Sequence, residues 1–272
     1  MNYTNKKVAL TGADGFLGSA LKEQLEFEGA EVVCLAGDIR DRKTFDQLDF
    51  TFDYLFHFGA PSSQVQFKRM PTYCMQTTVV GFMNAATAAK RHGIRLVYPS
   101  TGLLSMGSAN EYARCKQFCE DFAAGKKMDA IGLRIFATYG PGEGHKRDYA
   151  SVPYLFARDI VDGKSPVVFG DGEQVRDFIF IDDVVTAALV LAEDCPDAVI
   201  DVGSGEQTSF NRIIEIINND QDDTVKPTYV EKPGGYVMET AANPTRLHDF
   251  YVPSINLEQG IGQLIDGLKE GK

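Results

Sequence analysis

Short apolar runs alternate with longer segments of helical periodicity over the first half of the chain. The runs have the composition of β-strands, and most are bounded by Gly, Asp or Pro. They lie at residues 7–10, 31–36, 53–58, 95–100 and 130–136. Between them, apolar positions recur at helical spacing over 17–28, 72–92 and 110–124. Strand, helix and strand in this order predict an α/β fold with a doubly wound parallel sheet covered by helices.

The pattern changes after Gly140. The stretch "GPGEGHKRDYAS" is rich in glycine and charge, and the elements that follow are shorter. We expect strands at "PVVFG" and "RDFIFI" and helices near 150–162, 182–193, 209–219 and 256–269. The chain is therefore divided into a first domain, residues 1–140, and a smaller mixed α/β lobe, residues 141–272, with a chain crossing between the two.

A glycine motif follows the first apolar run. "TGADGFLG" has the pattern G-x-x-G-x-x-G and opens onto the first helical segment. Gly12 would allow a tight turn, Gly15 the close approach of a pyrophosphate, and Gly18 the packing of helix on strand. A purely structural turn explains the same pattern. As a phosphate cradle, the motif predicts a Rossmann-type dinucleotide-binding domain with Phe16 and Leu17 against the cofactor.

Charge and composition exclude several classes of protein. The chain has 27 basic and 38 acidic side chains and no basic run, which argues against nucleic acid as a partner. No segment approaches the roughly 18 apolar residues of a membrane span, and the apolar run near the N-terminus is too short for a signal peptide. We therefore expect a cytoplasmic protein with no membrane partner.

The cysteines are five in number and scattered, which favours free thiols. Cys115 and Cys119 lie one helical turn apart and could form half of a metal site. No second Cys/His pair completes it, so we expect no metal.

Tyr112 and Lys116 are four residues apart on an expected helix and so share one face. A neighbouring ammonium favours the phenolate, which would lower the pKa of Tyr112 and suit it to general acid/base chemistry. The strand at 95–100 ends in Ser100, and Thr101 follows, so a hydroxyl lies beside the expected phenol. The same Tyr-x-x-x-Lys spacing also occurs as an ordinary surface pair.

These motifs, in this order, resemble the short-chain dehydrogenase/reductase superfamily, and the resemblance covers nearly the whole chain. The stretches "RIFATYGPGEGHK", "VVFGDGEQVRDFIFIDDVVTAAL" and "IDVGSGEQTSFNRIIEII" are similar to its extended branch, the NAD(P)-dependent nucleotide-sugar epimerases and dehydratases. The resemblance implies a nucleotide-sugar substrate. It also implies a homodimer, in which residues 72–92 and 110–124 of each subunit pack into a four-helix bundle.

By this resemblance, Tyr112 removes a hydroxyl proton from the sugar, Thr101 hydrogen-bonds the same oxygen, and Lys116 binds the cofactor ribose. The implied cofactor contacts are Gly12, Gly15, Phe16, Leu17, Gly18, Asp38, Ile39, Phe58, Gly59, Ala60, Thr78, Tyr112, Lys116 and His145. The implied substrate contacts are Ser62, Thr101, Arg176 and Tyr236, with Arg176 on the diphosphate. A salt bridge to Asp177 is the alternative interpretation of Arg176.

The resemblance favours epimerisation over other fates of a keto-sugar. "YGPGEGHKRDYASV" resembles the ADP-heptose 6-epimerase pattern, in which Lys146 would serve as a second acid/base group. A solvated lysine in a charged loop is the alternative. A 4,6-dehydratase is disfavoured, because Gly102 and Leu103 stand where its acidic pair would follow the hydroxyl. Ala137 and the short stretch between Thr101 and Tyr112 depart from the family pattern and put heptose specificity in doubt.

The type of dinucleotide depends on the end of the second strand. Ala36 stands where relatives have an acidic residue for the adenosine ribose. Asp38 could take that role and select NAD, whereas Arg40 or Arg42 could accept a 2′-phosphate and select NADP. We favour NAD. Two other functions stay open, an NAD(P)H-dependent keto-sugar reductase and a non-catalytic dinucleotide-binding sensor.

Overall fold

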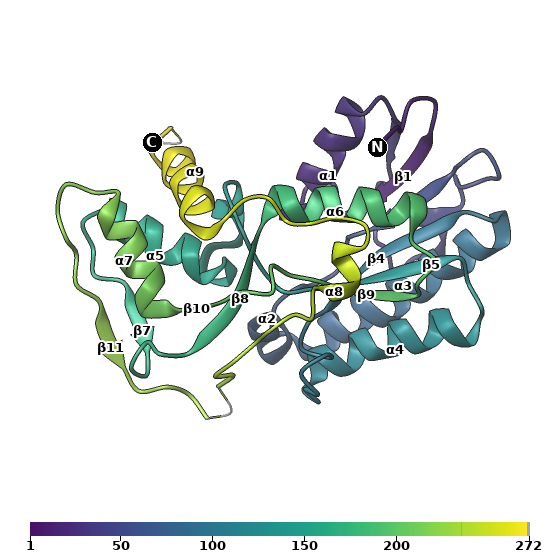
Figure 1. Ribbon diagram of the computed structural model, residues 1–272. Helices are drawn as coiled ribbons and strands as arrows, with labels where there is room; N and C mark the ends of the chain where they lie inside the picture. Colours follow the sequence, from purple (N-terminus) through teal and green to yellow (C-terminus); the bar gives the residue numbers. More distant parts are fainter. Residues whose placement is uncertain (235, 271–272) are drawn as a thin grey trace. The chain divides into compact units, whose positions relative to one another are not determined.

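The computed structural model describes residues 1–234 and 236–270; Gly235 and residues 271–272, in the expected C-terminal lobe, lie outside the described part. The chain forms two compact units (Figure 1). Unit 1 holds residues 1–135, 185–202 and 245–252, and unit 2 holds 136–184, 203–244 and the segment from 253 onward. The chain thus returns twice to unit 1 after residue 140. The boundaries 1–140 and 141–272 stay a prediction of domain organisation.

Unit 1 is built on a six-stranded sheet in the order β2-β1-β3-β4-β5-β9, and every neighbouring pair is parallel. Its strands are β1 (Lys7–Thr11), β2 (Glu31–Cys34), β3 (Tyr54–His57), β4 (Arg95–Thr101), β5 (Ala130–Ile135) and β9 (Val199–Val202). The strand order reverses at β1, since β2 lies on one side of it and β3 on the other. Such a switch point, at the carboxyl ends of the strands, is where α/β sheets bind ligands. The parallel sheet expected from the sequence is confirmed.

Three helices of unit 1 begin and end within one residue of the expected ranges 17–28, 72–92 and 110–124: α1 (Phe16–Phe27), α3 (Pro71–His92) and α4 (Glu111–Gly125). Unit 1 also holds η1 (Arg42–Phe45), α2 (Gln64–Arg69), α8 (Thr245–His248) and the later part of α6 (Ile181–Asp194). Local chemistry sets the ends. Pro71 lies at the start of α3, left-handed Gly93 caps its end, and the Asn110 side chain caps α4 by accepting from the Ala113 amide at 2.9 Å.

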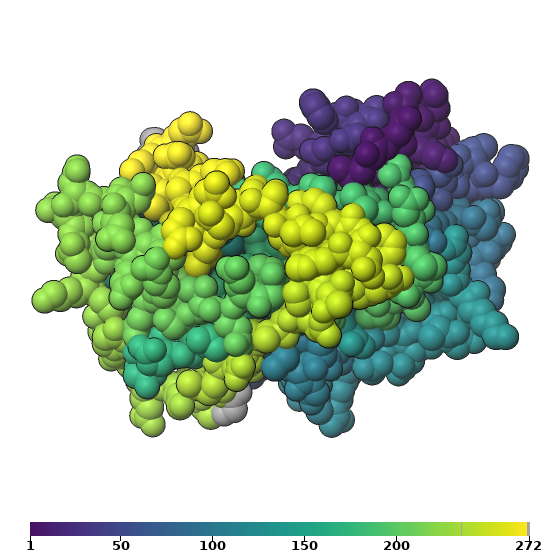
Figure 2. All heavy atoms as spheres, in the orientation of Figure 1, coloured from purple at the N-terminus to yellow at the C-terminus, as the bar shows by residue number. Residues whose placement is uncertain are grey.

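The 245–252 segment joins unit 1 through an ion pair. Arg246 lies 2.5 Å from Asp197, which precedes β9. Figure 2 shows the yellow-green atoms of this segment lying against the green atoms that belong to α6 and the residues after it.

Strand β2 ends two residues earlier than the apolar run 31–36 suggested. It is an edge strand, and the chain turns away at Gly37, whose φ of +118° is in the region that favours glycine. Among the described residues, no helix is long and apolar enough to cross a lipid bilayer.

Unit 2 is a smaller mixed α/β lobe. A three-stranded sheet has the order β10-β8-β6, and a separate parallel pair joins β11 to β7. The strands are β6 (Ala137–Tyr139), β7 (Val167–Phe169), β8 (Val175–Phe180), β10 (Gln207–Ser209) and β11 (Thr228–Val230). The helices are η2 (Glu143–Tyr149), α5 (Val152–Val161), α7 (Phe210–Asn219) and α9 (Leu257–Glu270). Ser151 and Ser209 cap α5 and α7 through their hydroxyls.

Candidate active site

The glycine motif forms the turn between β1 and α1. Gly12 has a φ of +76°, and a Cβ there would lie 2.7 Å from the backbone of Gly59. A Cβ on Gly18 would lie 1.8 Å from the Gly12 carbonyl oxygen, so α1 packs directly on the turn. Gly15 differs, because only the Gly12 oxygen, at 3.2 Å, lies within 4 Å of its Cβ position. Gly12 and Gly18 therefore serve packing, and Gly15 leaves space beside the start of α1.

A dinucleotide phosphate fits this turn. The cap of α1, Gly15, makes no side-chain hydrogen bond to the helix, and no acidic residue lies in the first turn. Neither a side chain of the cap residue nor a carboxylate of the first turn therefore competes with an anion for the backbone amides at the start of the helix. Phe16 is buried and Leu17 half-buried at the same point.

Thr11 and His57 connect the glycine turn to the segment after β3. The Thr11 hydroxyl lies 2.9 Å from His57 Nδ1 and accepts a hydrogen bond from the Gly59 amide at 3.2 Å. Burial, with a smaller effect of the Lys116 charge, lowers the pKa of His57 to about 3. A neutral imidazole therefore holds the ends of β1 and β3 together. Sequence reasoning missed both residues, although His57 interrupts an apolar run at a strand end.

The segment 58–62 continues from this point. Phe58, Gly59 and Ala60 are half-buried, and Ser62 is exposed, with its amide donating to Gln66 at 3.2 Å. Thr78 on α3 is buried, and its hydroxyl has no hydrogen-bond partner among the described residues. An orphaned buried hydroxyl is compatible with the cofactor contact expected for Thr78.

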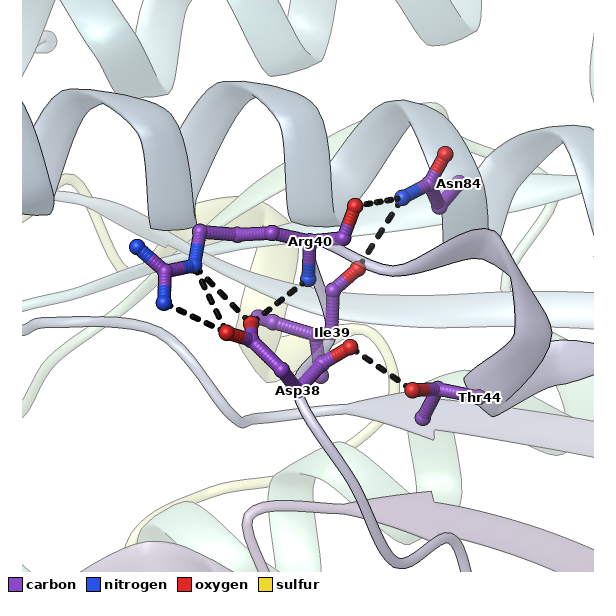
Figure 3. Close-up of polar contacts among 5 residues, drawn as sticks. All are labelled: Asp38, Ile39, Arg40, Thr44 and Asn84. Carbon is purple, nitrogen blue, oxygen red and sulfur yellow. Dashed lines mark hydrogen bonds and ion pairs between the residues drawn. The ribbon is translucent and has the colours of Figure 1, made fainter.

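The residues after β2 form a turn with fixed main-chain contacts (Figure 3). Arg40 Nε lies 2.9 Å from both carboxylate oxygens of Asp38. Thr44 donates to the Asp38 carbonyl at 2.7 Å, and Asn84 of α3 donates to the carbonyls of Ile39 and Arg40 at 3.1 and 3.0 Å. Hydrogen bonds from Arg40 hold the pKa of Asp38 down to about 2. A carboxylate and a guanidinium thus lie together at the position that sequence analysis assigned to cofactor selection.

The hydroxyl, phenol and ammonium expected for catalysis lie in unit 1. Thr101 ends β4 and its side chain lies beside that of Tyr112, while Lys116 Nζ donates to the Pro99 carbonyl at 2.8 Å. The Lys116 ammonium lies 6.0 Å from the centre of the Tyr112 ring. Ser100 is committed elsewhere, since it donates to Glu120 at 2.5 Å. Thr101, and not Ser100, is therefore the hydroxyl beside the phenol.

The pKa of Tyr112 moves in the direction opposite to the sequence-based expectation. Burial raises the pKa of Tyr112 to about 12, and the neighbouring Thr101 hydroxyl opposes this only in part. Phe67 packs against the phenol with ring centres 5.3 Å apart, and Tyr112 is 8% exposed. Burial also lowers the pKa of Lys116. The spacing of the two residues indicated their shared helix face, but it contains no information about the desolvation that dominates both pKa shifts.

Lys146 lies in unit 2 with a buried counter-charge. Its Nζ is 2.7 Å from Glu143 Oε2, and Glu143 is fully buried and also accepts from the amide and hydroxyl of Ser151 at 2.8 and 2.6 Å. Lys146 is thus held by a protein carboxylate and is not a solvated side chain. His145 is exposed, and its Nδ1 lies 3.0 Å from the Gly142 carbonyl oxygen.

Arg176 lies between two aromatic rings of unit 2. Its guanidinium carbon is 5.5 Å from the ring centre of Phe210 and 5.7 Å from that of Tyr236. It donates to the carbonyls of Val175 and Val237, and burial lowers its pKa. The planar group is pre-oriented by stacking and fixed hydrogen bonds.

Asp177 does not pair with Arg176. Its carboxylate accepts from the amides of Ser204, Gly205 and Ala242 at 2.8, 2.9 and 3.0 Å, and no ion pair joins it to Arg176 within the described residues. The salt-bridge alternative for Arg176 is therefore wrong.

The cysteines are free thiols, as expected. Across residues 1–234 and 236–270, no group of three or more His, Cys, Asp or Glu side chains is placed to hold a metal ion.

The chain is similar in sequence and in fold to several known proteins. The chain is 23% identical over 301 residues to a putative UDP-glucose 4-epimerase of Methanocaldococcus jannaschii, covering 96% of this chain and 98% of the relative. The solved UDP-glucose 4-epimerase of Thermotoga maritima with UDP-glucose matches with a TM-score of 0.90 at 22% identity, covering 97% and 99% of the two chains. The ADP-L-glycero-D-manno-heptose-6-epimerase of Helicobacter pylori matches with a TM-score of 0.86 at 25% identity, covering 99% of each chain.

Other similar proteins catalyse different reactions. They include UDP-glucuronic acid decarboxylase 1 of Arabidopsis thaliana, 23% identical, and an NDP-hexosamine 5,6-dehydratase, 22% identical. Residues 8–203 match the sequence model of a protein family, the "NAD dependent epimerase/dehydratase family". The chain therefore belongs to the NAD dependent epimerase/dehydratase family.

Proposed function

We propose that this protein is a nucleotide-sugar epimerase that acts through a transient keto-sugar. The observation that carries the proposal is the Thr101 side chain beside Tyr112, with Lys116 buried one turn along the same helix. Tyr112 would remove the proton from a sugar hydroxyl, and Thr101 would hold the same oxygen. NAD, when bound, supplies a hydride acceptor and later a hydride donor. Return of the hydride to the opposite face inverts the carbon, with no net redox change.

A second acid/base group distinguishes an epimerase from a simple reductase. After inversion the sugar oxygen is reprotonated, and Lys146 is our candidate for this transfer. Its support is its place in the "GEGHK" stretch and its ion pair with buried Glu143. A reductase would use Tyr112 in the same way but would need no second group.

The proposed substrate grip involves Arg176 and Tyr236. A guanidinium held between aromatic rings suits a diphosphate, because its donors form a planar fork. UDP-glucose is the ligand of the T. maritima relative, which supports a sugar nucleotide as the class of substrate here. Ser62, exposed in the loop after β3, is a further proposed contact.

The proposed cofactor is NAD, in keeping with the family. Its phosphates would meet the start of α1 beside Gly15, and Asp38 would take the adenosine ribose. A carboxylate at this point repels a 2′-phosphate, although its pairing with Arg40 leaves NADP as a second candidate.

A homodimer and a cytoplasmic location complete the proposal. Large apolar side chains lie exposed on α3 and α4, at Tyr73, Met75, Val80, Met83 and Phe118. A second copy packing its own α3 and α4 against them would bury this surface. The cytoplasmic location rests on the five free thiols.

Dehydration is disfavoured because Gly102 and Leu103 supply no carboxylate after Thr101. The test is a panel of sugar nucleotides incubated with the enzyme and NAD, with products identified by NMR. An epimerase forms an isomer at constant NADH absorbance. A reductase instead consumes NADH with a keto-sugar, and a non-catalytic sensor binds cofactor but converts no member of the panel.

A further inference from the structure

We infer that Glu120 is a positioning residue that sets the distance between Thr101 and Tyr112. The inference rests on the proposed function, because it assigns Glu120 to the hydroxyl, phenol and ammonium of that same site. Tyr112, Lys116 and Glu120 recur every four residues on α4 and therefore lie along one helix face. All three are buried.

Two residues of this face hold the end of β4. Ser100 donates to Glu120 Oε1 at 2.5 Å, and Lys116 donates to the Pro99 carbonyl at 2.8 Å. Pro99 and Ser100 directly precede Thr101. The end of β4 is thus attached to α4 at two consecutive residues, and the position of Thr101 beside Tyr112 follows from these attachments.

An arginine fixes the orientation of the Glu120 carboxylate. Arg134 Nε lies 3.0 Å from Oε1 and one of its terminal nitrogens 2.7 Å from Oε2, so the two side chains meet fork to fork. Arg134 is the register partner of Ser100 on the adjacent strand β5. Glu120 is 6% exposed, and a buried carboxylate of this kind needs such a partner. The arginine thereby keeps Oε1 directed at Ser100.

The same arginine reaches the connection between β4 and α4. It donates to the Ser105 hydroxyl at 3.2 Å, and Ser105 donates to Asp201 of β9 at 2.6 Å. The short stretch that joins Thr101 to Tyr112 is therefore attached to β5 and β9 as well. Glu120 and Arg134 thus join β4, β5, α4 and this connection to one another. Neither side chain needs to contact the substrate to do so.

The test compares Glu120→Gln with Asp121→Asn. The amide of Gln would face the donors of Arg134, so the fork and the Ser100 contact are both disturbed. Asp121 is an exposed carboxylate of the same helix that accepts from Gln117 at 2.9 Å, which makes it a matched control. We expect Glu120→Gln to lower kcat by about tenfold or more and to change the KM for the sugar nucleotide by less than about twofold. Asp121→Asn should keep both values.

A milder pair of variants covers the case in which Glu120→Gln fails to fold. Ser100→Ala removes one donor and should lower kcat by about fivefold, whereas Ser100→Thr keeps the hydroxyl in a residue that suits a strand and should restore kcat. Unchanged kcat per folded enzyme in Glu120→Gln or Ser100→Ala, with only a lower Tm, would overturn the inference.

Failure of the proposed function gives a different result. In that case Tyr112→Phe turns over normally, or the wild type converts no sugar nucleotide. Binding of NADH, followed by its fluorescence, then serves as the readout, because Lys116 is the proposed ribose contact. Glu120→Gln should lower the affinity for NADH by about fivefold, and Asp121→Asn should leave this affinity unchanged. Equal affinity in the two variants would overturn the inference.

Discussion

The hydroxyl oxygen of Thr11 and Nδ1 of His57 lie 2.9 Å apart at the carboxyl ends of the adjacent strands β1 and β3. Burial lowers the pKa of His57 to about 3, whereas a histidine in the unfolded chain titrates near 6.5. Between these values the unfolded state binds more protons, so the free energy of unfolding falls as the pH falls.

We therefore expect His57 to cost about 3 kcal/mol of stability between pH 7 and pH 4. His57→Gln should be less stable than wild type at pH 7 but should lose less on acidification. His248→Gln, which changes an exposed histidine of the same unit, should follow the wild type. The measurement is the free energy of unfolding by urea at both pH values. Parallel losses in wild type and His57→Gln would contradict this role.

Gly18→Ala tests the packing of α1 on the glycine turn. The added Cβ would lie 1.8 Å from the Gly12 carbonyl oxygen, so backbone must move. We expect a loss of about 2 kcal/mol or more in the free energy of unfolding, together with weaker NADH binding. Gly125→Ala, at the end of α4, places its Cβ with no atom within 4 Å and should be neutral or stabilising by up to about 1 kcal/mol. Equal effects of the two substitutions would show that the packing argument is wrong.

Cofactor choice should respond in opposite ways to the two members of the Asp38–Arg40 pair. Asp38→Asn removes the charge that repels a 2′-phosphate and should shift the ratio of NADH to NADPH affinity toward NADPH by about tenfold. Arg40→Ala exposes the carboxylate and should shift the ratio toward NADH. Arg42→Ala distinguishes the role of Arg42 from that of Arg40. A larger change in the affinity ratio in Arg42→Ala than in Arg40→Ala would assign the 2′-phosphate contact to Arg42. Fluorescence titration with each reduced cofactor supplies the affinities.

Arg176→Lys should raise the KM for a sugar nucleotide by about tenfold, with kcat within about threefold, because a lysine keeps the charge but cannot form a planar fork. Arg212→Lys is the control, since Arg212 is an exposed arginine of the same unit paired with Glu215 and Glu258. Steady-state kinetics of both variants decides the matter. An unchanged KM in Arg176→Lys would show that Arg176 does not bind the substrate.

The sequence pattern predicted the strands that are continuous apolar runs and the helices whose apolar positions recur at helical spacing. Strands β1, β3, β4 and β5 were predicted because each is a mostly buried apolar run between turn residues. Strand β11 was missed because all three of its residues are exposed and carry no such pattern. Strand β9 pairs with β5 across more than sixty residues of intervening chain, and local periodicity contains no information about such pairing.

The candidate site was predictable to the extent that its residues share one helix or one loop. The spacing of Tyr112 and Lys116 placed them on one face of α4, as observed. The predicted direction of the Tyr112 pKa shift was wrong, because the shift depends on burial by Phe67 and other groups distant in sequence. Sequence analysis also missed two partners, Glu120, which binds Ser100, and Glu143, which binds Lys146. The reason is related, since the sequence does not indicate whether a carboxylate in a helix or charged loop is buried.

The central claim is that Tyr112 transfers the proton during epimerisation, and one NMR measurement tests it directly. Wild type and Tyr112→Phe, at equal concentrations of folded and NAD-loaded enzyme, are each incubated with the sugar nucleotide that the wild type converts. We expect the signals of the epimer to appear with wild type and to form at least about a hundredfold more slowly with Tyr112→Phe. Epimer formation at the wild-type rate in Tyr112→Phe would contradict the account.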